Sequence, residues 1–336
     1  MFAIIGAGAW GTALAVHLGK AGWPAKIWDI DLRHVRNLSS DRENRRYLPG
    51  VPLPRCVQPV EELEAATRGA ECILLVTPSS ALRETFRHLK PLLSRGVRVC
   101  CASKGLEVTS GLLTHQVAAE ELGADFPLAA VSGPTFATEV AAGLPAAITV
   151  ASENAGLARW LALKLNSGAL RAYVSGDLTG VEVGGATKNV IAIGAGLSDG
   201  LGYGANARAA LLCRGLAEIV RLGVALGARA SSFMGLAGLG DLALTCSDDL
   251  SRNRRLGLKV AQGSSVDEAL EELGQVAEGL YAADAVHRLS RRLDLDLPIS
   301  EQVYQVLHRG RDPAKVLKAL LSRPLKSEDE VPVAAS

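Results

Sequence analysis

The sequence predicts an α/β protein with an N-terminal doubly wound sheet and a C-terminal all-helical domain. Three observations lead to this fold class. The chain begins with a strand, a glycine turn and a helix, apolar strand-like runs then alternate with helical stretches to residue 176, and almost no such run follows. The predicted division is therefore a first domain at 1–176, a helical domain at 177–326 and a polar tail at 327–336.

The opening stretch "FAIIGAGAWGTALAVHLGKAG" contains Gly6, Gly8 and Gly11 in the spacing GxGxxG. A lone GxGxxG also occurs in purely structural turns. Here an apolar strand precedes it, a helix follows, and the second strand "AKIWD" ends in Asp29. This context is typical of a Rossmann-type dinucleotide site, where the turn approaches a pyrophosphate and the helix N-terminus faces it.

The next apolar runs are "CILLV" at 72–76, "VRVCCAS" at 97–103, "LAAVSG" at 128–133 and "AAITVAS" at 146–152. "LRAYVSG" at 170–176 is a candidate for one more strand. Continuous apolar runs of this length favour a sheet that helices cover on both faces. From residue 177 to about 322 the periodicity is that of helices.

Composition excludes several classes of function. The formal net charge is +1, so no global charge attracts nucleic acid or an anionic membrane. The six cysteines form no CxxC pair and the six histidines show no metal spacing, so we expect reduced thiols, a reducing compartment and no metal site. No run is long enough to span a bilayer, and the first residues read as a strand rather than a secretory leader. These features predict a cytoplasmic protein that inserts into no membrane.

Two polar clusters follow strands of the predicted sheet. In "ASKGLE", Lys104 could hold an anion or a substrate hydroxyl, because ligands of such sheets lie beyond the carboxyl ends of strands. In "SGPTFATE", Gly133 turns the chain, Thr135 offers a hydroxyl and Ala137 an unobstructed backbone. A solvated surface lysine and a simple turn are the structural alternatives.

Lys188 lies in "GGATKNVIAIGAG", an apolar, glycine-rich stretch in which a lysine is costly to bury. Asp241 lies in a similar stretch, "GLGDLAL". The two residues could form a structural ion pair, but buried pairs stabilise poorly. Beside a nicotinamide cofactor, a lysine of lowered pKa can act as general acid or base, with Asp241 orienting it.

The run "SRNRR" begins at Ser251 and continues through Arg252 and Asn253. Arginine and asparagine are good hydrogen-bond donors to phosphate. The more common fate of such a charge run is a solvated helix face, and that alternative stays open.

Taken together, the motifs resemble the bacterial NAD(P)-dependent sn-glycerol-3-phosphate dehydrogenase family from about residue 2 to residue 322. They are "GAGAWGTALA", "YLPG", "ASKGLE", "SGPTFA", "KNV" with "AIGAG", "GLAGLGDL" with "LTC", "SRNRR" and "VAEG". The resemblance implies reduction of dihydroxyacetone phosphate by NAD or NADP in its reduced form, for glycerophospholipid synthesis. It also implies a helical domain like that of 6-phosphogluconate dehydrogenase, and a homodimer.

The resemblance further assigns roles by motif position. It implies that Lys188 is the general acid/base, with Asp241 beside it. The implied substrate contacts are Lys104, Gly133, Thr135, Asp241, Ser251, Arg252 and Asn253. The implied cofactor contacts, with the three glycines and Asp29 of the turn, are Ala9, Trp10, Lys104, Ala137, Arg252 and Glu278.

Two positions depart from the family pattern. Many relatives have Ser in place of Ala9, and relatives often follow the tryptophan of "IWDIDLRH" with Gly or Ala and then His or Arg. Here Asp29 ends the strand. A carboxylate there accepts a hydrogen bond from a ribose 2′-hydroxyl and repels a 2′-phosphate, which predicts a preference for NADH. Arg33 could still admit NADPH.

Two other functions remain as alternatives. A ketopantoate reductase or β-hydroxyacid dehydrogenase shares the architecture and uses a lysine from a helical domain, but it would not need the Thr135 turn with "SRNRR". A catalytically silent dinucleotide-binding regulator would not need Lys188 beside Asp241.

Overall fold

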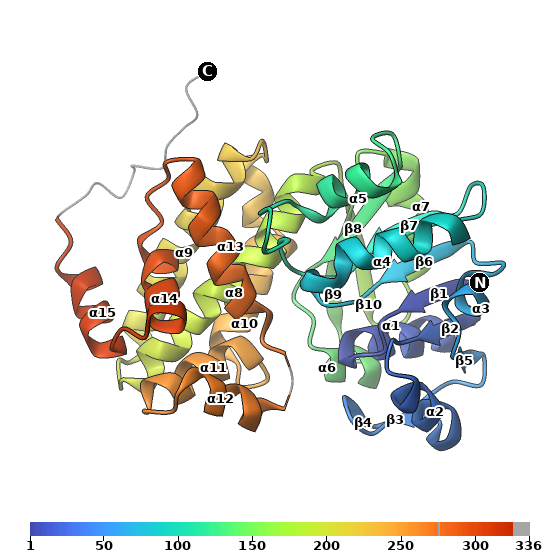
Figure 1. Ribbon diagram of the computed structural model, residues 1–336, viewed down its shortest axis with the longest axis horizontal. Helices are drawn as coiled ribbons and strands as arrows, with labels where there is room; N and C mark the ends of the chain where they lie inside the picture. The colour runs from blue at the N-terminus through green and yellow to red at the C-terminus, as the bar shows by residue number, and fades with distance from the viewer. Residues whose placement is uncertain (275, 325–336) are drawn as a thin grey trace. The chain divides into compact units, whose positions relative to one another are not determined.

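Figure 1 shows the computed structural model of the chain, in which residues 1–274 and 276–324 are described. The chain divides into two compact units. The first comprises Met1–Ser103 and Thr114–Leu178, and the second comprises Lys104–Leu113 and the residues from Thr179 onward. The chain therefore passes into the second unit at Lys104 and returns to the first unit after Leu113. The predicted tail at 327–336 lies outside the described residues.

The first unit is built on an eight-stranded sheet with the order β10-β9-β8-β7-β6-β1-β2-β5. Its strands are β1 (Phe2–Ile5), β2 (Ala25–Trp28), β5 (Val57–Pro59), β6 (Cys72–Leu75), β7 (Arg98–Cys101), β8 (Leu128–Ser132), β9 (Ala146–Ala151) and β10 (Leu170–Ser175). All the apolar runs predicted as strands are strands, including the candidate at 170–176. The predicted α/β class is confirmed.

The sheet pairs in parallel except between β8 and β9, which run antiparallel. A separate two-stranded antiparallel ribbon joins β3 (Glu43–Asn44) to β4 (Leu48–Pro52). The sequence analysis did not predict β3, β4 or β5. The sequence of β4, "LPGVP", and the Pro59 that ends β5 are typical of loops, and β3 has only two polar residues, so only the pairing partners make these segments strands.

Helices cover the sheet of the first unit. They are α1 (Ala9–Lys20), α2 (Leu32–Asp41), α3 (Leu63–Thr67), η1 (Ser79–Ala81), α4 (Leu82–Leu89), η2 (Lys90–Leu92), α5 (Thr114–Leu122), α6 (Ala137–Ala142) and α7 (Ala155–Leu165). Alternate residues of the central strands pack with apolar residues of α1 and α7 in one core. The intervening residues of β1 and β6 are buried as well, so both faces of the sheet are covered.

The second unit is helical, and none of its described residues belongs to a strand. Its elements are α8 (Leu178–Gly200), α9 (Ala205–Ala225), η3 (Ala230–Met234), η4 (Leu236–Gly240), α10 (Asp241–Ser247), α11 (Arg252–Ala261), α12 (Val266–Leu273), α13 (Glu278–Arg292), α14 (Pro298–Arg309) and α15 (Pro313–Leu321). The short element η4 is a single π-helical turn directly before Asp241. The helical prediction for this region is confirmed.

The central helix of this unit is α8, which is buried along most of its length. The segment Lys104–Leu113 packs on the same core through Leu106 and Leu113, each 1% exposed. Arg292 of α13 donates to the carbonyl oxygen of Ser110 at 3.2 Å, which fastens the segment to the helical unit. Among the described residues, no helix has the length and apolar character needed to cross a membrane.

Candidate active site

The glycine turn of the first unit follows β1 and depends on close backbone contacts. Gly6 has φ +110°, and a Cβ there would lie 2.6 Å from the carbonyl oxygen of Val76. A Cβ on Gly11 would lie 2.0 Å from the carbonyl oxygen of Gly6. Both positions therefore require glycine to bring β1, β6 and the start of α1 together.

Gly8 differs, because a Cβ on it would meet nothing within 4 Å. It is the N-cap of α1, and no side chain caps that N-terminus. The first N–H groups of the helix carry partial positive charge, and there is open space beside the side-chain-free residue that caps them. This arrangement fits the pyrophosphate of a dinucleotide. Ala9 and Trp10 form the first turn, and the buried indole N–H of Trp10 has no partner among the described residues.

Asp29 follows β2 at the carboxyl edge of the sheet. One of its carboxylate oxygens accepts a hydrogen bond from the Ala7 N–H at 2.7 Å, and the other accepts one from the Asp31 N–H at 3.1 Å. The carboxylate is therefore held against the glycine turn, where the ribose of a bound dinucleotide lies in this type of fold.

A cavity of about 530 Å³ lies between α2 and the ribbon. Arg33, Arg45 and Arg46 line it, together with Asp31. Asp31 pairs with Arg46 at 3.0 Å, and its pKa is lowered, first by the His34 N–H that it caps and then by Arg46. Arg33 is exposed. The cavity thus contains both signs of charge.

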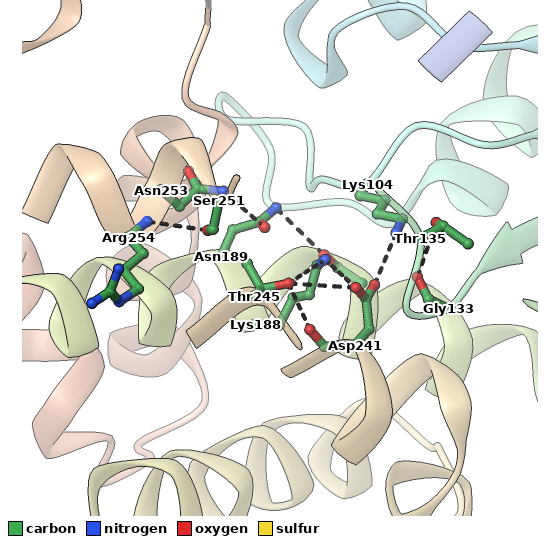
Figure 2. A network of polar contacts seen from close by, with 11 residues as sticks. Lys104, Gly133, Thr135, Lys188, Asn189, Asp241, Thr245, Ser251, Asn253 and Arg254 are labelled. Carbon is green, nitrogen blue, oxygen red and sulfur yellow. Dashed lines mark hydrogen bonds and ion pairs between the residues drawn. The ribbon is translucent and has the colours of Figure 1, made fainter. Parts of the chain in front are cut away.

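In the second unit, Lys188, Asp241 and Lys104 come together around one carboxylate (Figure 2). The Lys188 ammonium donates to Oδ1 of Asp241 at 2.5 Å, and the Lys104 ammonium donates to Oδ2 at 2.9 Å. Asp241 is 1% exposed and Lys188 is 6% exposed. Two lysines from distant segments therefore share one buried anion.

The local sequence explains how these groups meet. A Cβ on Gly184 of α8 would lie 2.5 Å from the carbonyl oxygen of Ala237, so only glycine lets the turn η4 approach α8 so closely. Lys188 lies one helical turn after Gly184, and Asp241 begins the helix that follows η4. The small residues around Lys188 thus let η4 approach α8 closely enough for Asp241 to pair with Lys188.

Thr245 completes this cluster, although the sequence analysis did not select it. Its hydroxyl accepts from the Lys188 ammonium at 2.9 Å and donates to the carbonyl oxygen of Asp241 at 2.6 Å. The spacing of four residues in a helix places Thr245 on the same face as Asp241, and this spacing is a signal that could have identified it. Lys188 therefore uses two of its three donors, and no further acceptor for it occurs among the described residues.

Burial and the neighbouring charges shift the pKa values of Lys188 and Asp241 in opposite directions. Burial lowers the pKa of Lys188 to about 8, although the Asp241 carboxylate counteracts part of the shift. For Asp241, burial alone would raise the pKa, but the charges of Lys104 and Lys188 outweigh it and the pKa is lowered. At neutral pH the cluster holds an ionised carboxylate and a lysine that can release its proton near physiological pH.

The run that begins at Ser251 forms the start of α11. Ser251 is the N-cap, and its hydroxyl oxygen accepts from the Arg254 N–H at 3.2 Å. Asn253 donates to the Asn189 side chain at 2.9 Å and accepts from the Gly279 N–H at 2.9 Å. Asn189 is the neighbour of Lys188, so Asn253 ties the start of α11 to the lysine-bearing helix. Arg252 is exposed.

The remaining predicted residues are distributed over both units. In the first unit, a Cβ on Gly133 would lie 2.7 Å from the carbonyl oxygen of Ala147, and the Thr135 hydroxyl donates to the Gly133 carbonyl at 3.2 Å. Ala137 is the first residue of α6. In the second unit, Glu278 is the first residue of α13, whose next N–H binds Asn253. Among the described residues, no cluster of His, Cys, Asp or Glu could hold a metal ion.

Comparisons with known proteins agree with this geometry. The sequence profile of the NAD-dependent glycerol-3-phosphate dehydrogenase N-terminus matches residues 1–158, and that of the C-terminus matches residues 177–318. The chain is 49% identical over 326 residues to "Glycerol-3-phosphate dehydrogenase [NAD(P)+]" of Shewanella halifaxensis, covering 97% of this chain and 96% of the relative. It is 50% identical over 326 residues to the protein of that name from Aeromonas hydrophila, covering 97% and 98%.

Solved structures also show similarity to glycerol-3-phosphate dehydrogenases. The crystal structure of glycerol-3-phosphate dehydrogenase from Coxiella burnetii matches with a TM-score of 0.94 and 43% identity, covering 96% of this chain and 98% of that one. A ketopantoate reductase from Ralstonia eutropha, at 16% identity and a TM-score of 0.59, shares the fold alone. The resemblance inferred from the motifs is confirmed: the chain belongs to the NAD-dependent glycerol-3-phosphate dehydrogenase family.

Proposed function

We propose that this chain catalyses the reversible reduction of dihydroxyacetone phosphate to sn-glycerol 3-phosphate, the precursor of glycerophospholipids. The observation that carries the proposal is the buried Lys188, which Asp241 and Thr245 hold while one of its donors remains for a ligand. Family membership adds the substrate, because the relatives are named glycerol-3-phosphate dehydrogenases.

The nicotinamide cofactor, when bound, supplies the hydride that adds to the carbonyl carbon of the substrate. As the hydride arrives, negative charge develops on the carbonyl oxygen. Lys188 donates a proton from Nζ to that oxygen, which gives the alcohol and leaves a neutral amine. Lys104 and Asp241 keep a fixed set of charges around the oxygen, because a carboxylate between two ammonium groups holds both in place. In the oxidative direction, the neutral Lys188 accepts the hydroxyl proton.

The start of α11 suits the phosphate of the substrate. Its first N–H groups carry partial positive charge, and Arg252 adds a full one. The Ser251 hydroxyl accepts one hydrogen bond and keeps its own proton as a donor, and the Asn253 amide keeps its second N–H. We assign the phosphate to these groups. Gly133 and Thr135 as substrate contacts, and Ala137 and Glu278 as cofactor contacts, remain predictions from the family motifs.

The proposal is tested by following NADH absorbance with purified protein and three substrates: dihydroxyacetone phosphate, dihydroxyacetone and ketopantoate. Oxidation of NADH with the phosphorylated ketone, at a much higher kcat/KM than with dihydroxyacetone, is the expected result. Turnover of ketopantoate instead would favour a keto-acid reductase. NADH binding without turnover of any of the three would favour a silent regulator.

The same assay tests the predicted preference for NADH. Asp29 is fixed by two backbone N–H groups, so its negative charge cannot swing away from an incoming 2′-phosphate. Arg46 is paired with Asp31 and Arg45 with Asp41, at 3.0 and 3.5 Å. Of the three arginines that line the cavity, Arg33 is then the one left to bind such a phosphate. We expect a higher kcat/KM with NADH than with NADPH, and an Asp29→Asn variant in which the ratio moves toward NADPH. A clear NADPH preference of the wild type would overturn this assignment.

We further propose that the enzyme acts in the cytoplasm as a homodimer. None of the six cysteines is in a disulfide, which fits a reducing compartment. The homodimer rests on the family motifs. Light scattering of the purified protein measures the oligomer directly, and a monomeric mass would contradict it.

A further inference from the structure

Arg254 is the second arginine of the "SRNRR" run, and it does not lie on a solvated helix face. Its side chain is 9% exposed. Its Nε and Nη2 donate to Oδ2 of Asp199 in α8, at 3.0 and 2.7 Å, and its Nη1 pairs with Asp249. In Figure 2 the Arg254 guanidinium points away from Lys188 and Asp241. Arg254 is therefore a buried cation that the proposed chemistry does not use.

The pair between Arg254 and Asp199 joins two helices whose backbones touch. A Cβ on Gly196 of α8 would lie 1.9 Å from the carbonyl oxygen of Arg254, and a Cβ on Gly257 of α11 would lie 2.1 Å from that of Ile193. No side chain separates the helices at these points. The ion pair lies at this crossing and adds a directional contact between the two helices to the close packing of their backbones.

The helix that this pair holds carries the groups assigned to the phosphate. Ser251, Arg252 and Asn253 directly precede Arg254, and Asn253 contacts Asn189, the neighbour of Lys188. A displacement of α11 by a fraction of a turn would move these donors relative to Lys188. Misplacement of binding groups by about 1 Å can lower a rate by about a hundredfold.

We propose that Arg254, through its ion pair with Asp199, is a positioning residue that sets the phosphate-binding end of α11 relative to Lys188. The inference rests on the proposed function. It explains why a buried ion pair is present where apolar residues would stabilise at least as well, because such pairs can fix geometry rather than add stability. Arg254 itself touches no substrate in this account.

Two variants test the proposal. Arg254→Met removes the charge, and Arg254→Lys keeps the charge but loses the two-nitrogen contact with one carboxylate oxygen. Each is compared with the wild type for kcat and KM with dihydroxyacetone phosphate, and for kcat/KM with dihydroxyacetone, which has no phosphate. We expect KM for the phosphorylated ketone to rise about tenfold or more in both variants. The kcat/KM for dihydroxyacetone should stay within about twofold, since it does not use the α11 donors.

The chain offers a matched control in Arg208 of α9. Its Nη1 donates to the same Oδ2 of Asp199 at 2.9 Å, but it comes from a different helix than the phosphate donors. Arg208→Met also removes one cation from Asp199, so a purely structural role of the cluster would affect both positions alike. We expect Arg208→Met to leave KM for dihydroxyacetone phosphate within about twofold of the wild type.

The outcomes separate the two proposals. If the wild type does not turn over dihydroxyacetone phosphate, the proposed function fails before any variant is compared. If the wild type is active and the folded Arg254 variants keep its KM, or lose both substrates equally, the positioning role is wrong. It is also wrong if Arg208→Met raises KM as much as Arg254→Met does. Should Arg254→Met fail to fold, the Arg254→Lys result decides.

Discussion

The glycine turn of the first unit and the lysine cluster of the second both depend on glycines that let backbones touch, but they use the contact differently. Gly6 and Gly11 close a turn in which the backbone itself offers the binding groups. Gly184 brings η4 to α8 so that two charged side chains, Lys188 and Asp241, can meet in a buried place. In the proposed function, the first region binds the cofactor where side chains are absent, and the second acts through side chains whose pKa values burial and charge have changed.

The comparison is tested most strongly by Asp241→Asn. This change leaves Lys104 and Lys188 without the carboxylate they share, and breaking a buried pair on one side costs about 3–5 kcal/mol. We expect kcat for dihydroxyacetone phosphate reduction to fall by about a thousandfold or more, because the unpaired Lys188 loses its proton more readily. Steady-state kinetics and urea unfolding measure both effects.

The control for this change is Asp267→Asn, at an exposed position in the first turn of α12. Removal of this charge should change the free energy of unfolding by less than about 1 kcal/mol and leave kcat unchanged. If Asp241→Asn keeps kcat within threefold of the wild type, the cluster does not hold the reacting proton.

The glycine turn predicts a contrast between two substitutions by alanine. Gly11→Ala places a Cβ 2.0 Å from a backbone oxygen, so the turn must shift, and we expect a loss of about 1–3 kcal/mol or more in the free energy of unfolding. Gly8→Ala meets nothing within 4 Å, so stability should change by less than about 1 kcal/mol. Its methyl group would instead occupy the approach of the pyrophosphate and weaken NADH binding.

Urea unfolding and a fluorescence titration with NADH separate these effects. A Gly8→Ala protein with wild-type affinity for NADH would show that the open space beside Gly8 is not used by the cofactor. A Gly11→Ala protein as stable as the wild type would show that the turn can relax around the added carbon.

The smallest effect on catalysis is expected from Glu218, a buried carboxyl of α9 outside both regions. It accepts hydrogen bonds from the Ile299 and Ser300 N–H groups at the start of α14, at 2.5 and 2.9 Å. Burial raises its pKa from 4.5 to about 7 in spite of these bonds. A raised carboxyl pKa stabilises the folded state at low pH, and this contribution is lost as the pH rises from about 4.5 through about 7.

Glu218→Gln should remove that part of the pH dependence, on the order of a few kcal/mol, while kcat stays within about twofold. Urea unfolding between pH 4.5 and 7 measures it, with Glu271→Gln on the exposed face of α12 as the control. If the wild type and Glu218→Gln show the same pH dependence of stability, Glu218 does not titrate in this range.

Much of the fold was predictable from the sequence because it depends on patterns among residues that are close together along the chain. Apolar runs gave the strands, and GxGxxG with its flanking elements gave the turn. The antiparallel step between β8 and β9 and the short strand β5 were not predictable, since they depend on pairing partners more than 15 residues away along the chain. The strands β3 and β4 pair with each other at close range, but β3 has only two polar residues and β4 contains Pro and Gly, so neither shows a strand pattern. In the site, a lone lysine and a lone aspartate in apolar surroundings indicated a pair, and Lys188 and Asp241 do meet.

Other parts of the site could not be predicted from residue type. Arg254 and Arg252 are chemically identical and two positions apart, yet one is buried on Asp199 and the other is exposed. Residues two positions apart along a helix point to nearly opposite sides, and tertiary packing rather than residue type decides which side of α11 faces α8. Thr245 was overlooked because a threonine in an apolar helix carries no charge to mark it, although its spacing from Asp241 was visible.

The central claim is that Lys188 supplies the proton in reduction. It is tested most directly by measuring kcat for dihydroxyacetone phosphate reduction as a function of pH in the wild type and in Lys188→Ala. Because the protonated amine is the acid and its pKa is lowered to about 8, wild-type kcat should fall as the pH rises through about 8. Lys188→Ala should lose about two to four orders of magnitude in kcat and show no such inflection. Near wild-type activity in the variant, or the same inflection near pH 8, would contradict the account.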